Sequence, residues 1–82
     1  MALSELKNAA MVIGTRQVVK HLNKNQIKKV FIAEDAESHV IEPVKQLCRQ
    51  MQIEVEMVEN MEVLGRAVGI EVGSATVALL ND

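Results

Sequence analysis

The segment that begins at Gly14 carries the polar side chains with the clearest chemical use in this sequence. Gly14 suits a tight turn, and the hydroxyl of Thr15 is suited to start a helix. Arg16, Gln17 and Lys20 then lie together on the first turn and a half of that helix. An arginine fork can donate to the N7 and O6 edge of guanine, and a glutamine amide offers one donor and one acceptor. Beside a helix N-terminus that favours phosphate oxygens, these groups suit a distorted RNA groove.

The basic residues of this helix belong to a cationic part of the chain. Lys24 and Lys28 continue the basic pattern and are suited to contact RNA phosphates. Residues 1–33 carry six lysines and arginines against one glutamate, a net charge of +5, whereas residues 34–82 carry three against ten acids, a net charge of −7. Such a charge asymmetry favours binding of a polyanion by the basic face. The alternative is an ordinary surface helix whose lysine-rich face contacts only solvent, and the sequence leaves both open.

The loop that ends at Gly73 is the second segment with a functional chemistry. Ile70 and Val72 are bulky and aliphatic where a loop is ordinarily polar, and Glu71 stands between them. Exposed aliphatic side chains are costly in water, so they either cover an apolar surface of a partner or fold back onto the core. The unstacked bases of an RNA bulge offer such a surface. The alternative is a hydrophobic hairpin that closes onto the sheet.

The scarcity of aromatic residues argues against one way of binding RNA. Phe31 is the only phenylalanine, tyrosine or tryptophan, and its neighbours Val30 and Ile32 place it in a buried strand. Domains that stack single-stranded bases on aromatic platforms are therefore not expected. RNA recognition by this chain must use groove edges, phosphates and aliphatic contacts.

The other reactive residue types are placed for packing or for contact with solvent. Cys48 falls on the apolar stripe of a helix without a partner base, so we expect an inert buried thiol. His21 and His39 lack metal-ligand spacing, and the acidic cluster at residues 34–37 is better explained as a solvated turn than as a cation site. We therefore expect no enzyme activity, no metal, no cofactor and no small-molecule substrate.

A small α/β domain must position these segments. Apolar periodicity alternates between helical and strand patterns along a single domain, residues 1–82, without a repeat or a linker. We expect a three-layer α-β-α sandwich with helices on both faces of a small mixed β-sheet. The expected helices cover residues 5–9, 15–25, 41–51 and 60–68, and the expected strands cover residues 10–13, 29–33, 53–58 and 75–80.

Three local features refine these elements. Pro43 lacks a backbone N–H, so the regular part of its helix is expected to begin near Ile41–Pro43. Asn60 is expected to cap the helix that follows it. The strand at residues 53–58 alternates glutamates with apolar residues, which suits a sheet edge and discourages pairing with a second chain. We therefore expect a monomer.

Cysteine content and hydropathy favour the cytoplasm. A single cysteine cannot form an internal disulfide, which fits a reducing compartment. No apolar run is long enough to span a bilayer, and no signal segment opens the chain. We expect a cytoplasmic protein without membrane contact, either free or associated with ribosomes.

Three segments together resemble the kink-turn RNA-binding family of the ribosomal proteins L7Ae and L30e. They read Ile-Gly-Thr at residues 13–15, Ile-Ala-Glu-Asp-Ala at residues 32–36, and Leu-Gly-Arg-Ala-Val-Gly-Ile-Glu-Val-Gly at residues 64–73. The resemblance runs essentially from end to end, and the length is that of the compact bacterial members. It implies the same α-β-α sandwich.

The resemblance also implies a particular way of binding RNA. Members of this family hold a sharply bent RNA in which tandem sheared G·A pairs present guanine edges. Their reading residues fall on Arg16, Gln17 and Lys20, and the loop that shields bulged nucleotides falls on residues 70–72. The archaeal and eukaryotic pattern has Asn-Glu where this chain has Arg-Gln. Because the neutral Gln17 lacks the charge assistance of a carboxylate, we expect weaker or differently tuned binding that keeps its kink-turn selectivity.

The sequence thus predicts a small protein that recognises and stabilises kink-turn RNA, located in ribosomal RNA or in a structured messenger leader such as a riboswitch. A structural ribosomal component would use the same surface, and a protein–protein adaptor on the same fold is a further alternative. The predicted RNA-binding residues are Gly14, Thr15, Arg16, Gln17, Lys20, Lys24, Lys28, Ile70, Glu71, Val72 and Gly73.

Overall fold

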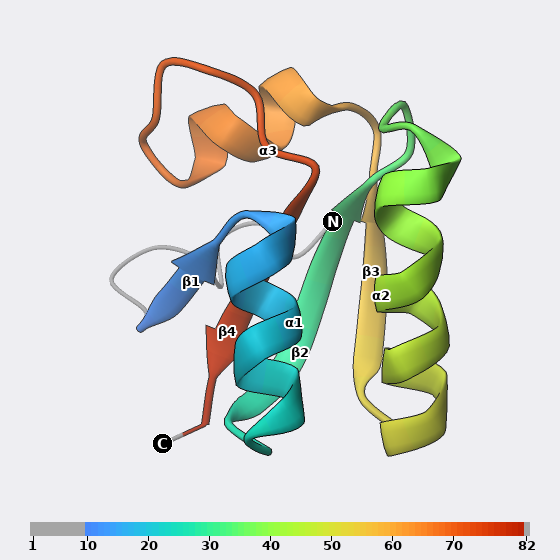
Figure 1. The fold of residues 1–82 in the computed structure, drawn as a ribbon. Coiled ribbons are helices and arrows are strands. Elements are labelled where there is room, and N and C mark those ends of the chain that lie inside the picture. The colour runs from blue at the N-terminus through green and yellow to red at the C-terminus, as the bar shows by residue number, and fades with distance from the viewer. Residues whose placement is uncertain (1–9, 82) are drawn as a thin grey trace.

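A computed structural model describes residues 10–81 and shows four strands and three helices in this range (Figure 1). The strands are β1 (Met11–Ile13), β2 (Ile27–Ala33), β3 (Glu54–Val58) and β4 (Thr76–Leu80). The helices are α1 (Thr15–Asn23), α2 (Ser38–Met51) and α3 (Met61–Ala67). The predicted helix over residues 5–9 lies outside the described residues.

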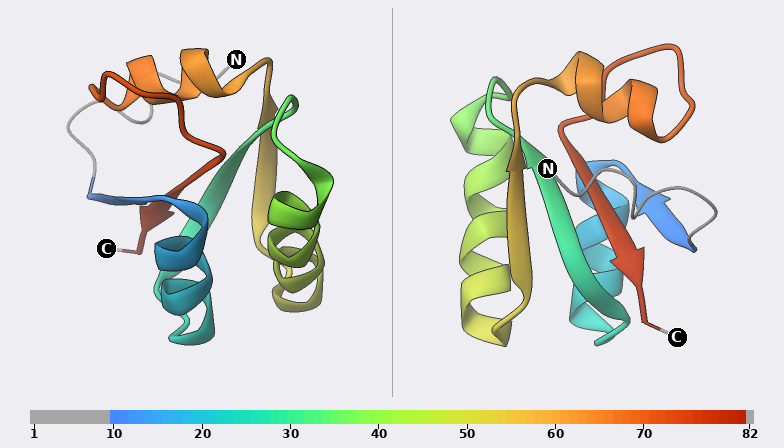
Figure 2. Two further views of the ribbon diagram at one scale, coloured as in Figure 1. Left: turned by 45° about the horizontal axis from the view of Figure 1, so that its top comes forward. Right: turned by 180° about the vertical axis from the view of Figure 1, so that it is seen from behind.

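The strands form one mixed sheet in the order β1-β4-β2-β3. β2 and β3 run parallel, whereas β4 is antiparallel to both of its neighbours, β1 and β2. Figure 2 shows that α1 and α2 cover the same face of the sheet, and that α3 lies across the end where β2 and β3 finish. The predicted α/β fold with a small mixed sheet is confirmed, whereas the two long helices share one face of the sheet instead of lying on both faces.

The core includes the central strand β2 and the helices that cover it. Val30 and Ile32 of β2 are fully buried, and so are Val18 of α1 and Val44 of α2. Cys48 is a free cysteine buried in the same core. Burial raises the pKa of its thiol from 9.0 to about 11, because the charged thiolate is poorly solvated there. Cys48 is therefore a packing residue, as predicted.

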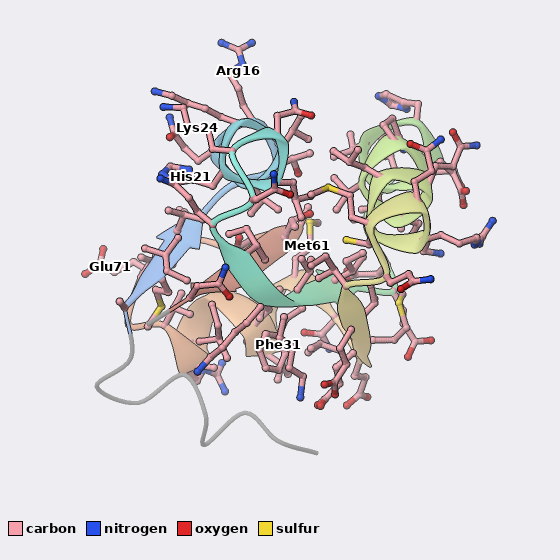
Figure 3. All side chains as sticks on the ribbon, turned by 90° about the horizontal axis from the view of Figure 1, so that it is seen from below. Arg16, His21, Lys24, Phe31, Met61 and Glu71 are labelled. Atoms are coloured by element: carbon pink, nitrogen blue, oxygen red, sulfur yellow. The ribbon has the colours of Figure 1, made fainter. Side chains whose placement is uncertain are left out.

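The other face of β2 holds a buried cation. Figure 3 shows Phe31 on the side of the sheet away from α1 and α2, and its ring is fully buried. The Lys29 Nζ lies 5.0 Å from the centroid of this ring. The same Nζ is 3.1 Å from a carboxylate oxygen of Glu56 and 3.3 Å from one of Glu54. The predicted edge position of β3 is confirmed, and its glutamates neutralise one cation of the basic N-terminal part.

The start of α2 differs from the prediction. The helix begins at Ser38 rather than near Ile41–Pro43, and Pro43 lies inside it. The N–H groups of Val40 and Ile41 both donate to the Glu37 carbonyl, at 2.9 and 3.3 Å. The first turn therefore forms ahead of the proline, which removes only a single hydrogen bond near the helix start.

Candidate nucleic-acid interface

The turn between β1 and α1 forms one end of the candidate interface. Gly14 has a φ of 102°, a conformation that favours glycine, and its N–H donates to the Thr76 carbonyl at 2.9 Å. The hydroxyl of Thr15 does not cap the helix. Thr15 is already the first helical residue, and its Oγ1 lies 3.1 Å from the Oγ1 of Thr76. Because Gly14 at the N-cap position has no side chain, the first N–H groups of α1 remain available to ligand oxygens.

One side of α1 presents the predicted polar residues to solvent. Val18 and Leu22 are fully buried and hold the helix against the sheet. This packing leaves Arg16, Gln17 and Lys20 exposed. The first turn of α1 contains no acidic residue that would repel a phosphate. The helix start is therefore a cationic, hydrogen-bonding surface.

The basic side chains of this surface are free to meet a ligand. Arg16, Lys20 and Lys24 form no ion pair with another residue in the range 10–81. Figure 3 shows Arg16 and Lys24 directed away from the sheet. Lys28 is also exposed, but it lies beyond the end of α1, at a register shift near the start of β2. The structure therefore separates Lys28 from the helix start.

The loop between α3 and β4 is held at both ends by backbone hydrogen bonds. The N–H of Ile70 donates to the Gly65 carbonyl, and the N–H of Ser74 donates to the Met61 carbonyl, each at 3.1 Å. A Cβ on Gly65 would collide with the carbonyl oxygen of Val72. A glycine is therefore required where the loop passes over α3.

The side chains of this loop do not close onto the core. Val72 is 71% exposed, whereas Ile70 is half-buried. Glu71 between them is exposed, and Figure 3 shows it on the flank of the molecule that also carries Lys24 and His21. The sequence left open whether these aliphatic side chains face a partner or fold back onto the core. Val72 faces outward, whereas Ile70 is only partly buried.

A hollow of about 620 Å³ lies between this loop and α3. Met61, Ile70 and Val72 provide its apolar lining, and Arg66 and Asp35 are among its polar residues. The Asp35 carboxylate accepts a hydrogen bond from the N–H of Met61 at 2.8 Å, so the exit of β2 holds the start of α3. Asp35, Met61 and Arg66 were not predicted as site residues from the sequence. The available signal was that Asp35 and Arg66 lie inside the segments that carry the family resemblance.

Thr76 joins the two predicted segments. It follows the loop closely in the chain, and its contacts with Gly14 and Thr15 fix the loop exit beside the start of α1. Figure 1 shows the helix start and the loop towards the same end of the molecule. The structure therefore brings together the helix start at residues 14–20 and the loop at residues 69–73.

The described part of the chain offers little to other functional classes. No group of three or more His, Cys, Asp or Glu residues within residues 10–81 is placed to hold a metal ion. In the same range, no helix is long and apolar enough to cross a membrane.

Comparison with known proteins identifies the family. Residues 2–82 match the family described as Ribosomal protein L7Ae/L30e/S12e/Gadd45 family. The chain is 45% identical over 69 residues to the RNA-binding protein BH0128 of Halalkalibacterium halodurans, which covers 84% of each protein. It is 37% identical over 76 residues to the RNA-binding protein YbxF of Geobacillus stearothermophilus, which covers 93% of each. These names describe binding proteins rather than enzymes, as expected for this chain.

A solved structure supports the same assignment at the level of the fold. The Giardia lamblia 15.5kD RNA binding protein superposes with a TM-score of 0.91 at 20% identity, over 99% of this chain and 72% of that one. The chain therefore belongs to the ribosomal protein L7Ae/L30e/S12e/Gadd45 family, in which it is similar to bacterial RNA-binding proteins such as YbxF.

Proposed function

We propose that this chain is a non-enzymatic RNA-binding protein that recognises and stabilises kink-turn RNA. The observation that carries the proposal is an exposed cationic helix start held beside an exposed aliphatic loop by the same residue, Thr76. A kinked RNA presents phosphates and base edges together with unstacked bases, so its recognition requires both kinds of surface at once. The relatives named as RNA-binding proteins support this reading.

In this proposal the start of α1 enters the widened groove of the RNA. Its free N–H groups bind phosphate or base oxygens. Arg16 donates to the N7 and O6 edge of a guanine in a sheared G·A pair, and the amide of Gln17 contacts a neighbouring base edge. Lys20 lies one turn further along the same side and adds a charge at the groove. Lys24 and Lys28 neutralise phosphates of a flanking stem.

The loop covers the bases that the bend leaves unstacked. Val72 provides the exposed aliphatic contact, and Ile70 supports it from a half-buried position. The neighbouring hollow of about 620 Å³ has room for an extruded base beside the Arg66 guanidinium. Gly73 packs against Met61, which keeps the loop over α3. The exposed Glu71 disfavours close phosphates at this point, so bases rather than backbone face the loop.

Recognition of this kind stabilises the bent RNA by selection. The protein binds the kinked form more tightly than the extended form, and it shifts the equilibrium between them by the ratio of the two affinities. Ribosomal RNA is the first class of partner to examine, because the family description includes ribosomal proteins. Co-sedimentation with ribosomal particles at near-stoichiometric level would separate a ribosomal component from a free cytoplasmic regulator that binds messenger leaders as a monomer.

The direct test is a pair of affinity titrations. One RNA duplex contains a kink-turn, and a matched duplex has its tandem G·A pairs replaced by Watson–Crick pairs. The proposal expects tight binding to the first, and weak, strongly salt-dependent binding to the second. Equal affinity for the two duplexes would contradict it, because the basic surface would then contact phosphates without regard to RNA shape.

A further inference from the structure

A second pocket lies at the far end of α1, away from the helix start and the loop. It has a volume of about 400 Å³ and is lined by His21, Asn25, Gln26, Leu80 and Asn81. Three of these residues carry side-chain amides and one carries an imidazole. A surface hollow bordered by hydrogen-bonding groups, one apolar side chain and a flat ring suits a planar heteroaromatic ligand.

The residues at the end of α1 border this pocket, and backbone hydrogen bonds fix their conformation. The N–H of Asn25 donates to the Leu22 carbonyl at 3.0 Å, and the N–H of Gln26 donates to the His21 carbonyl at 3.1 Å. These two bonds form a Schellman-type helix end. Asn25 has a φ of 57°, in the left-handed region where glycine is the usual residue. The asparagine therefore adds an amide at a position where the backbone alone would favour glycine.

Asn81, which follows β4, is hydrogen-bonded to this helix end. Its backbone N–H donates to the Gln26 carbonyl at 2.7 Å, and its side-chain Nδ2 donates to the Asn25 carbonyl at 3.0 Å. Within residues 10–81, the side-chain amides of Asn25 and Gln26 form no hydrogen bond, and the Asn81 Oδ1 accepts none. The pocket is thus bordered by exposed amide groups of Asn25 and Gln26, and by the Asn81 Oδ1, that form no hydrogen bond within the fold.

His21 provides a ring beside these amides. Its Nδ1 lies 2.9 Å from the Gln17 carbonyl, and a carbonyl can only accept, so Nδ1 carries the proton. In the neutral ring, Nε2 is then an acceptor. Figure 3 shows His21 close to Lys24 on the outer flank of α1. The pocket therefore adjoins the basic flank of this helix.

The pocket is within reach of RNA held at the start of α1. Asn25 lies ten positions after Thr15, which corresponds to about 15 Å along a helix axis. This is the length of some four or five stacked nucleotides at about 3.4 Å each. An RNA strand that follows α1 from its start therefore passes the pocket a few nucleotides from the kink.

We propose that this pocket binds the base of one unpaired nucleotide, stacked against His21 and hydrogen-bonded at its edge by the amides of Asn25, Gln26 and Asn81. A side-chain amide forms a two-bond pair with the N6 and N7 edge of adenine, so adenine is the expected base. The inference rests on the proposed function, because RNA bound along α1 delivers the nucleotide. It adds a second, sequence-sensitive contact to recognition of the kink.

The variant Asn25→Gly tests this inference without disturbing the backbone, since glycine adopts the left-handed conformation readily. Affinities are measured for a blunt kink-turn duplex and for duplexes in which one stem or the other ends, about four base pairs from the kink, in unpaired adenosines. The native protein is expected to bind one tailed duplex about five-fold or more tightly than the blunt one. Asn25→Gly is expected to remove that gain and leave the blunt affinity unchanged. Equal affinity of the two proteins for every tailed duplex would overturn the RNA contact.

A second measurement does not depend on kink-turn binding. Adenosine monophosphate is titrated into the labelled native protein while the side-chain amide signals of Asn25, Gln26 and Asn81 are followed by NMR, with ribose 5-phosphate as the control that lacks a base. Amide signals that shift with adenosine monophosphate but not with ribose 5-phosphate support a base pocket. If tailed RNA then binds no more tightly than blunt RNA, the ligand of the pocket is a free nucleotide. Unmoved amide signals together with equal affinities for tailed and blunt RNA refute the pocket, even where the blunt kink-turn is bound tightly. Failure of the native protein to bind the blunt kink-turn refutes the proposed function instead.

Discussion

Truncation of Val72 to alanine tests the role of the exposed loop in a way that separates binding from stability. Val72→Ala removes two carbons, each worth about 0.8 kcal/mol when fully buried. Because Val72 is 71% exposed, folding alone gains only a small part of this burial free energy. If RNA covers this side chain, about 1 kcal/mol of binding free energy is lost, which is about a five-fold loss of affinity. The free energy of unfolding is expected to stay within about 0.5 kcal/mol of the native value.

The assay compares affinities for the kink-turn duplex and the Watson–Crick control, alongside chemical denaturation of the protein. Val58→Ala is the matched control, because Val58 is fully buried and its truncation is expected to lower the free energy of unfolding. At denaturant concentrations where the variant is folded, Val58→Ala is expected to bind the kink-turn duplex as tightly as the native protein does. An unchanged affinity in Val72→Ala, or an equal loss for both RNAs, would refute the assignment of Val72 to the unstacked bases.

Three further predictions concern the helix start, the loop and the core. Lys20→Ala is expected to weaken kink-turn binding by about 1–3 kcal/mol and to reduce the salt slope by about 1, as measured by titrations at several salt concentrations; an unchanged affinity would place α1 outside the groove. Gly65→Ala forces the Val72 carbonyl away from α3, so both the melting temperature and kink-turn affinity are expected to fall, and retention of both would contradict the close contact. Burial raises the pKa of Cys48 from 9.0 to about 11, so its stabilisation by the neutral thiol is complete below pH 9 and is lost as the pH rises towards 11. The free energy of unfolding is expected to decline more steeply over this range in the native protein than in Cys48→Ala, and parallel declines would count against the raised pKa.

Features that depend on neighbouring residues were predictable from the sequence. Asn60 caps α3 as expected, since its Oδ1 accepts from the N–H of Val63 at 2.8 Å, three residues away. Gly14 was expected at a tight turn, and its positive φ provides one. Caps and turns of this kind are determined within one turn of chain, so residue type and spacing are sufficient to indicate them.

Features that depend on distant residues were not predictable. The Thr15 hydroxyl contacts Thr76, 61 residues along the chain, in place of its own helix. Asp35 holds the N–H of Met61 across 26 residues, and this contact defines one side of the hollow. Local pattern carries no information about such pairings, because they arise only when the strands have assembled. The expected start of α2 near Pro43 was wrong for a local reason, since the N–H groups of Val40 and Ile41 close a first turn on the Glu37 carbonyl and the proline removes only one hydrogen bond.

The central claim is that the helix start and the loop recognise bent RNA. The most direct measurement is fluorescence energy transfer between labels at the two stem ends of a kink-turn duplex, recorded together with binding as protein is added. The account predicts that transfer rises over the same protein concentrations as binding, and that the Watson–Crick control shows no rise. Binding of the kink-turn duplex without a change in end-to-end distance, under conditions where the free RNA is extended, would contradict it.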